Sequence, residues 1–384
     1  MELRLALSGC RSVDAAPGAG SPGAQPDAGD SGVLTAAVGV PVVSVNAEPV
    51  AVFVGTPHVP VDGSTDIEAY QRSIRAGLKR LLGEAPFAEP PALRLQVLES
   101  HDDGDLHRHK VRYGSEADDV VWAWLLIPKG IDAPVPAVIC LPGSFMTPNW
   151  GKDAPAGLAG PLVAGDPEAY GRDLASLGFV ILCPDYPCCG ERTTPGQPSH
   201  DTTELDGRFP QWSRVGLSAW DVSRAVDVLQ EREEVDNSRI GTCGWSQGGQ
   251  MAIIGAALDE RITAVVSICG WGPWRGVGGS HAANWARSYN FPRLATCLER
   301  GGPLPLDFDD IVACVAPRPL LDVRAAQDET FPNRTEHAAA LEDLAQLWAQ
   351  VGAGERFRAV EVPGEHAHGV DSAREEQAWL RRWL

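Results

Sequence analysis

Between residues 93 and 384, short apolar runs alternate with longer stretches in which apolar residues recur every three or four positions. Runs of four to eight apolar residues indicate buried strands, and the three-to-four spacing indicates amphipathic helices. We expect strands at residues 93–98, 107–113, 120–127, 137–141, 179–183, 240–245, 262–269, 319–323 and 357–362. We expect helices at residues 166–177, 215–230, 247–258, 335–351 and 372–384. The pattern predicts an α/β protein whose mostly parallel sheet of about eight strands carries helices on both faces, with the first three strands pairing antiparallel at one end.

The region before residue 93 does not share this pattern. Residues 1–32 are rich in Ala, Gly, Pro, Ser and Asp without periodicity, which predicts a disordered or tether-like segment. Residues 33–92 form an N-terminal extension with one helix expected at residues 66–82, where Ser64 or Thr65 can cap the start. The main domain is therefore expected at residues 93–384.

Charge narrows the classes of partner. The chain of 384 residues is 44% hydrophobic and carries a formal net charge of -19. A strongly acidic surface repels phosphate backbones and anionic lipid headgroups, so roles on nucleic acid or at a membrane surface are disfavoured. The nearest candidate for a membrane span, residues 33–54, is interrupted by Pro, Asn and Glu.

The nine cysteines bear on the compartment. Their spacing is not that of a metal site, and several fall in apolar strand-like runs, which predicts buried free thiols and a reducing compartment such as the cytoplasm. A redox pair at Cys188 and Cys189 is the alternative. Residues 7–10, Leu-Ser-Gly-Cys, match a lipoprotein cleavage box at Cys10, so export remains an alternative if the true start lies upstream of Met1.

Residues 240–252 read as a strand, a sharp turn and the start of a helix. The turn holds Gly-x-Ser-x-Gly, with Ser246 at its centre between Gly244 and Gly248. This arrangement suits a nucleophile elbow, in which a strained turn lifts the Ser hydroxyl clear of the sheet. The alternative is an ordinary Gly-rich turn with a surface Ser.

A Ser hydroxyl needs a base, usually His, and the His needs a carboxylate to orient it. In this architecture the acid and then the His follow the Ser along the chain. Asp328 lies in a turn just after the strand at residues 319–323 and is the expected acid. Asp322 is inside that strand, and Glu329 is the fallback.

Two histidines compete for the role of base after the strand at residues 357–362. His366 follows a Pro-Gly-Glu turn directly, and His368 precedes a Gly. We expect His366 to be the base and retain His368 as the alternative, lining the pocket or capping the next helix. Reading His-x-His as a metal site lacks an obvious third ligand, so no metal is expected.

The oxyanion of an acyl-transfer reaction needs two backbone donors. The N–H of Gln247 is one candidate, and the loop after residues 137–141 offers the second at Ser144, or alternatively Phe145. Residues 270–310 form the longest break in the alternating pattern, and we expect a small cap there. Trp245, Trp271 and Trp274 are the candidate pocket residues; a peripheral aromatic core is the other interpretation.

The motif and its flanks resemble the α/β-hydrolase superfamily, in particular its acetyl xylan esterase and dienelactone hydrolase-like branch. The resemblance rests on Gly-Trp-Ser-Gln-Gly-Gly at residues 244–249, on Pro184-Asp185 with Gly190-Glu191-Arg192, and on the run 317–321 before Asp328. The deacetylases of that branch carry Arg-Gly-Gln before the elbow and His-Glu at the base. Here residues 189–192 read Cys-Gly-Glu-Arg, and Ala367 follows His366.

Together these features predict a serine hydrolase that cleaves carboxylic esters through an acyl-enzyme, without a cofactor. A Ser nucleophile in place of the Cys of dienelactone hydrolases favours an ordinary esterase. Short acyl esters are expected, including acetyl esters of carbohydrates or small molecules. The alternatives are a serine peptidase of the oligopeptidase type and a non-catalytic binding module on the same fold. The sequence does not give the oligomeric state.

Overall fold

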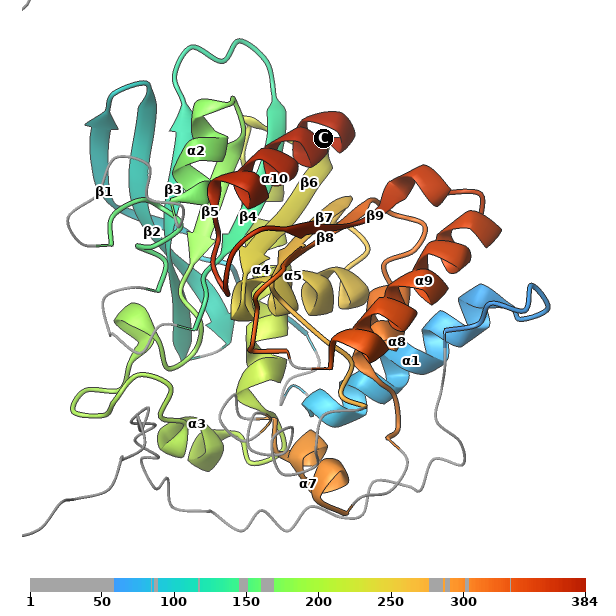
Figure 1. The fold of residues 1–384 in the computed structure, drawn as a ribbon. Coiled ribbons are helices and arrows are strands. Elements are labelled where there is room, and N and C mark those ends of the chain that lie inside the picture. The colour runs from blue at the N-terminus through green and yellow to red at the C-terminus, as the bar shows by residue number, and fades with distance from the viewer. Residues whose placement is uncertain are drawn as a thin grey trace, which may run out of the picture. The chain divides into compact units, whose positions relative to one another are not determined.

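The computed structural model describes residues 59–83, 85, 89–116, 118–144, 151–159, 169–275, 286, 291–300, 304–331 and 333–384. Cys10 and the segment at 1–32 lie outside these residues. Within them, nine strands form one sheet in the order β1-β2-β3-β5-β4-β6-β7-β8-β9 (Figure 1). The strands are β1 Gln96–Asp103, β2 Leu106–Glu116, β3 Asp119–Pro128, β4 Val135–Leu141, β5 Val180–Pro184, β6 Val235–Trp245, β7 Ala264–Ile268, β8 Leu320–Ala325 and β9 Phe357–Val362.

The sheet is parallel from β5 to β9 and antiparallel at the β1 end. β4 pairs in parallel with β5 and β6, and β6-β7-β8-β9 continue in parallel. β1, β2, β3 and β5 pair antiparallel in that order. The mostly parallel α/β class and the antiparallel first strands are therefore confirmed, and each of the nine strands overlaps one of the nine expected ranges.

β1 is the strand whose predicted position was most in error. The apolar run at residues 93–98 marks only its beginning, and the strand runs on to Asp103 through an exposed polar stretch. It pairs along β2 from Gln96 opposite Arg112 to Asp103 opposite Leu106. An exposed edge strand is stabilised by backbone pairing to its neighbour, so apolar patterning does not mark its end.

Helices cover both faces of the sheet. α2 Tyr170–Ser176 and α10 Val370–Trp383 pack on one face, with Leu174, Trp379 and Leu380 in one apolar cluster. The other face carries α1 Ile67–Leu82, α4 Arg214–Gln230, α5 Gln247–Leu258, α8 Phe308–Ala313 and α9 Arg334–Gln350 over a larger cluster. The short elements are η1 Gly190–Arg192, α3 Thr203–Arg208, α7 Pro292–Arg300 and η2 Gly354–Arg356.

α1 packs against the segment around α8. Its N-cap is Asp66, whose carboxylate accepts a hydrogen bond from the N–H of Ala69 at 3.0 Å, so the prediction of Ser64 or Thr65 was wrong. The Gln71 side-chain amide donates to the carbonyls of Ala313 and Ala316 at 2.8 and 2.9 Å. These contacts fix the helix of the N-terminal extension to the main domain.

The described cysteines are all free thiols, and all except Cys297 are buried. Cys188 and Cys189 are among them, so the predicted buried thiols are confirmed and the adjacent redox pair is not formed. In the part of the chain that the structure describes, none of the helices combines the length and the apolar character that a bilayer crossing requires.

α5 lies close to α4 because Gly255 leaves room for a neighbouring side chain. A Cβ atom at Gly255 would lie 2.6 Å from Cγ1 of Val222, which is shorter than a van der Waals contact. α5 is buried along nearly its whole length and follows β6 directly. The Gly255–Val222 contact therefore helps to set how α5 lies on the sheet.

We predict that Gly255→Val lowers the free energy of unfolding by about 1–3 kcal/mol, because the added methyl groups overpack the interface with α4. Urea unfolding followed by circular dichroism measures the change. Gly207→Val is the matched control, since Gly207 is also helical and has open space around its missing Cβ. An equal loss of stability in the two variants would contradict this account of Gly255.

Candidate active site

Ser246 stands between the end of β6 and the start of α5. Its backbone has φ 56° and ψ -122°, a conformation that side-chain-bearing residues rarely adopt. Its N–H donates to the carbonyl of Ile268 at the end of β7, at 2.8 Å. The neighbouring strand thus holds the strained turn in place, and Ser246 is only half-buried.

The two glycines of the motif are required by the space around the turn. A Cβ at Gly244 would lie 2.4 Å from the carbonyl carbon of Gly248, and a Cβ at Gly248 would lie 2.0 Å from the carbonyl oxygen of Leu141. No side chain fits at such distances. The first turn of α5 therefore packs directly on the backbone of β6 and on the end of β4.

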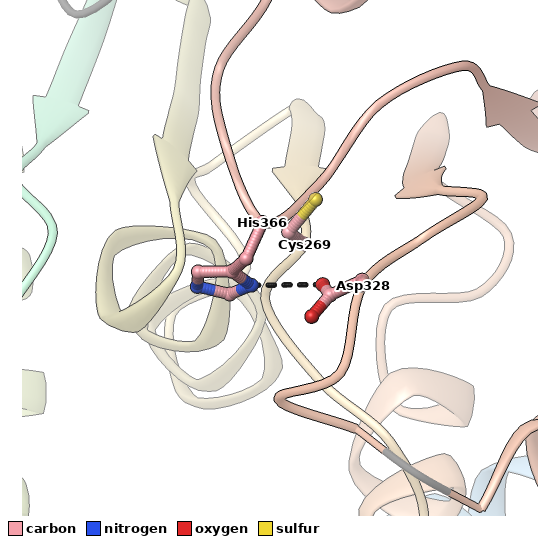
Figure 2. A group of neighbouring side chains, drawn as sticks. All are labelled: Cys269, Asp328 and His366. Atoms are coloured by element: carbon pink, nitrogen blue, oxygen red, sulfur yellow. Dashed lines mark hydrogen bonds and ion pairs between the residues drawn. The ribbon is translucent and has the colours of Figure 1, made fainter. Parts of the chain in front are cut away.

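His366 connects Ser246 to Asp328. Its Nε2 is 2.9 Å from Oγ of Ser246, and its Nδ1 is 2.8 Å from Oδ2 of Asp328, as the dashed line in Figure 2 marks for the second pair. A carboxylate can only accept, so Nδ1 carries a hydrogen and donates it to Asp328. In the neutral ring Nε2 is then free to accept the Ser246 hydroxyl hydrogen.

Asp328 is fixed on both of its carboxylate oxygens. Oδ1 accepts the N–H of Thr330 at 2.8 Å, while Oδ2 accepts from His366. Burial acts to raise the pKa of Asp328, but the hydrogen bond and charge of His366, together with the Thr330 hydrogen bonds, outweigh burial and lower the pKa below its ordinary value. Asp328 is therefore an anion beside the imidazole at neutral pH.

The loops that carry the acid and the base are hydrogen-bonded to each other. Beyond the paired ends of β8 and β9, the N–H of Gln327 donates to the carbonyl of Gly364 at 2.8 Å. The N–H of Gly364 donates in return to Oε1 of Gln327 at 2.7 Å. Gln327 thus links the residue before Asp328 to the turn before His366, which keeps the two side chains in register.

The other two acidic candidates are excluded from this position by their surroundings. Asp322 is buried in β8, where its Oδ1 accepts the indole N–H of Trp271 at 2.9 Å. Glu329 is exposed on the turn that carries Asp328. Of the three candidate carboxyls, Asp328 is the one hydrogen-bonded to His366.

His368 lies away from Ser246 and belongs to the core. It is 1% exposed, its Nε2 is 3.0 Å from Oε2 of Glu376 on α10, and its ring stacks on Tyr170 with centroids 5.0 Å apart. The Tyr170 hydroxyl in turn donates to the carbonyl of Leu141. His368 therefore holds its loop to α10 and α2, and the prediction of His368 as the alternative base is contradicted by its contacts.

The candidate oxyanion donors lie on two adjoining segments. Gln247 is the first residue of α5, a position whose N–H has no intrahelical acceptor. Ser144 belongs to the loop after β4, and the contact of Gly248 with Leu141 and Pro142 brings that loop against α5. Phe145 lies outside the described residues. The assignment of these donors stays a prediction.

Lys152, just after the described chain resumes beyond β4, is held by a buried carboxylate. The Lys152 N–H and Nζ donate to the two carboxylate oxygens of Asp185 at 2.7 and 2.9 Å, and Nζ also lies 2.7 Å from Oε2 of Glu191. Burial raises the pKa of Asp185 against the opposing effect of Lys152. The buried pair joins the segment around Lys152 to the loop after β5.

The three candidate pocket tryptophans have different surroundings. The Trp245 ring lies beside His366, with centroids 5.4 Å apart. Trp271 and Trp274 are buried and pack on Phe308 with centroids 5.5 and 5.7 Å apart. Those are contacts of core side chains, and the pocket role of Trp271 and Trp274 stays a prediction.

Sequence reasoning missed three side chains at this site: Gln327, Glu376 and Cys269. Gln327 and Glu376 come from other segments and hydrogen-bond to the loop that carries His366. The sequence around His366 gives no indication of these partners. Cys269 follows β7 directly and lies beside the Asp328–His366 pair (Figure 2). Its position at the end of a predicted parallel strand, next to the strand that ends at Ser246, was the available signal.

The chain is similar to one protein family and to individual proteins of known sequence. Residues 211–352 match the family described as glucuronyl esterase of fungi. The Bacillus subtilis (strain 168) protein named "Putative hydrolase YtaP" is 26% identical over 323 residues, which are 81% of this chain and 98% of YtaP.

Solved structures share the fold. A glucuronoyl esterase from Solibacter usitatus superposes with a TM-score of 0.67 at 19% identity, over 83% of this chain and 94% of that one. Acetyl xylan esterase 1 from Thermoanaerobacterium sp. JW/SL YS485 gives 0.53 at 14% identity, over 83% and 94%. The sheet order, the elbow and these likenesses establish the α/β-hydrolase fold.

We predict that His368→Ala lowers the free energy of unfolding by about 3 kcal/mol, because Glu376 is then left buried without its partner. The double variant His368→Ala/Glu376→Leu should recover part of this loss, since it removes the unpaired carboxyl. Urea denaturation measures each value. His366→Ala is the control, with an expected change of about 1 kcal/mol or less at its partly exposed position. Additive losses in the double variant would contradict the pairing.

Proposed function

We propose that this chain, a carboxylic-ester hydrolase of the α/β-hydrolase superfamily, acts on esters of carbohydrates and uses Ser246 as its nucleophile. In this proposal His366 is the base and Asp328 orients it. The observation that carries the assignment is the unbroken hydrogen-bonded chain from the Ser246 hydroxyl through both ring nitrogens of His366 to Asp328. Its position at the elbow supports the same roles.

The first half of the reaction acylates the enzyme. Oγ of Ser246 attacks the ester carbonyl carbon while its proton passes to Nε2 of His366. Asp328, an anion whose pKa lies below its ordinary value, stabilises the imidazolium that forms. The tetrahedral intermediate collapses when His366 returns the proton to the leaving alkoxide, which departs as the alcohol.

The second half repeats these steps with water. His366 takes a proton from a water molecule as the water oxygen attacks the acyl-enzyme carbonyl carbon. Collapse of this second intermediate breaks the bond to Oγ, and Ser246 recovers its hydrogen from His366. The products are a carboxylic acid and an alcohol, and the chemistry requires no cofactor.

The negative oxygen of both intermediates is assigned to the N–H groups of Gln247 and Ser144, with Phe145 as the alternative to Ser144. Gln247 begins a twelve-residue helix, whose dipole favours negative charge at this end. The close contact of α5 with the loop after β4 supports placing the second donor there. Each such donor contributes about 3 kcal/mol to lowering the barrier.

The carbohydrate part of the proposal rests on the relatives. The matching family is named for glucuronyl esters, and the solved structures named above include an acetyl xylan esterase. The sugar supplies the acid in the first kind of ester and the alcohol in the second. We assign the catalytic domain to residues 93–384, with Trp245 beside the base and the segment at 270–310 as a cap over the site.

We predict that Ser246→Ala and His366→Ala each lower kcat for p-nitrophenyl acetate by about 10⁶-fold, because they act as one unit. Asp328→Asn should lower kcat by about 10⁴-fold through the wrong imidazole tautomer. Release of p-nitrophenol measures kcat, and labelling by a fluorophosphonate shows whether Ser246 is reactive. Glu329→Gln, which changes the exposed neighbouring carboxylate, is the matched control and should match the wild type. Unchanged turnover in Ser246→Ala would remove Ser246 from the mechanism.

We predict that the wild-type chain hydrolyses at least one carbohydrate ester with a higher kcat/KM than p-nitrophenyl acetate, because binding of the sugar is used to orient the ester. Acetylated xylo-oligosaccharides test the sugar as alcohol, and methyl glucuronate tests it as acid. Product acids are measured by titration at constant pH. If neither sugar ester exceeds the simple ester, the carbohydrate assignment is wrong, while the Ser246 mechanism stands on the variants above.

A further inference from the structure

Cys269 brings a third potential metal ligand to the Asp328–His366 pair. It follows β7, has φ 46°, and its N–H donates to the carbonyl of Val323 in β8 at 2.8 Å. Its Sγ, a carboxylate oxygen of Asp328 and a ring nitrogen of His366 all lie within 4.8 Å of one another. Figure 2 shows the three side chains coming from three separate segments of the chain.

We propose that Cys269, Asp328 and His366 form an inhibitory site for a thiophilic divalent cation such as Zn²⁺. Zinc binds sulfur, imidazole nitrogen and carboxylate oxygen together, usually in a tetrahedron. Its bond lengths place neighbouring ligand atoms about 3.5 Å apart. The three atoms here all lie within 4.8 Å of one another, so small side-chain movements would bring them to that spacing. A water molecule would supply the fourth ligand.

Binding requires a defined movement of protons. The Cys269 thiol releases one proton to solvent when its sulfur joins the cation. Nδ1 of His366 faces Asp328, so its hydrogen must leave that nitrogen before the lone pair can bind, and the neutral ring then carries its hydrogen on Nε2. The net change is the loss of one proton and a switch of tautomer.

The tautomer switch accounts for inhibition. With hydrogen on Nε2, His366 has no lone pair to accept the Ser246 proton, so acylation stops. Asp328 is also drawn from the imidazole to the cation. Because Ser246 itself is not a ligand, the cation should lower kcat more than it raises KM for a small ester. This inhibition rests on the proposed role of His366, whereas cation binding itself does not.

Two readouts on the full chain test the proposal. Zn²⁺ is titrated into the p-nitrophenyl acetate assay, with Mg²⁺ as a hard-cation control and EDTA to reverse the effect. Co²⁺ is titrated separately, because a thiolate bound to Co²⁺ gives a charge-transfer absorption that counts sites without any catalytic turnover. That absorption is expected at one Co²⁺ per chain in the wild type and in Ser246→Ala.

Cys269→Ser is the decisive variant, and Cys189→Ser is its matched control. Cys189 is also buried and has Sγ 3.3 Å from Nδ1 of His200, so it is a competing thiol site. We expect Cys269→Ser, compared with its own activity without added metal, to need at least tenfold more Zn²⁺ for half-inhibition and to lose the Co²⁺–thiolate absorption. Cys189→Ser should behave as the wild type.

Three results would overturn the site. These are equal inhibition of Cys269→Ser and the wild type, loss of the Co²⁺–thiolate absorption only in Cys189→Ser, and no such absorption in the wild type. If Cys269→Ser does not fold, Cys269→Ala replaces it, because Ala removes the sulfur without burying a hydroxyl. Failure of Ser246→Ala to lose activity would count against the proposed function but leaves the Co²⁺ result independent.

Discussion

The backbone contact between α5 and the end of β4 is the constraint on which the site depends. A Cβ at Gly248 would stand 2.0 Å from the carbonyl oxygen of Leu141, so only glycine allows the helix to start where it does. Ser246 is thereby held at φ 56°, a strain of about 1–3 kcal/mol that the surrounding sheet maintains. The Ser246 hydroxyl oxygen then lies 2.9 Å from Nε2 of His366. The loops that carry Asp328 and His366 place their side chains next to this hydroxyl.

Parallel pairing explains why the remaining side chains converge. β7, β8 and β9 end at one edge of the sheet, and each delivers a polar side chain just beyond its last residues: Cys269, Asp328 and His366. Gln327 continues the β8–β9 pairing into the loops, so the acid and base are aligned by backbone bonds. The strand ends that bring Asp328 to the imidazole of His366 also bring the sulfur of Cys269 close to both side chains.

Only part of the site could be predicted from the sequence. Buried strands, the elbow and the order Ser, acid, His follow from local patterns, because a parallel sheet places these residues at one edge. The choice between His366 and His368 does not follow from local patterns. Both follow the same strand, and Glu376 and Tyr170, which bind His368, belong to helices that precede or follow it in the chain. The N-cap of α1 could not be predicted from residue type either, because Ser64, Thr65 and Asp66 are all suitable caps. Which of them caps the helix depends on where its first turn begins.

Electrostatics explain why the acid is in the loop and not in the strand. Burial raises the pKa of Asp322 to about 7, since the only hydrogen bond to it among the described residues is from Trp271. The nearby His337, 3.8 Å away, has its pKa lowered to about 3 by burial and brings no positive charge. A carboxyl that is half protonated at neutral pH cannot reliably stabilise an imidazolium. Asp328, with His366 and the Thr330 N–H on its two oxygens, remains an anion through the whole neutral range.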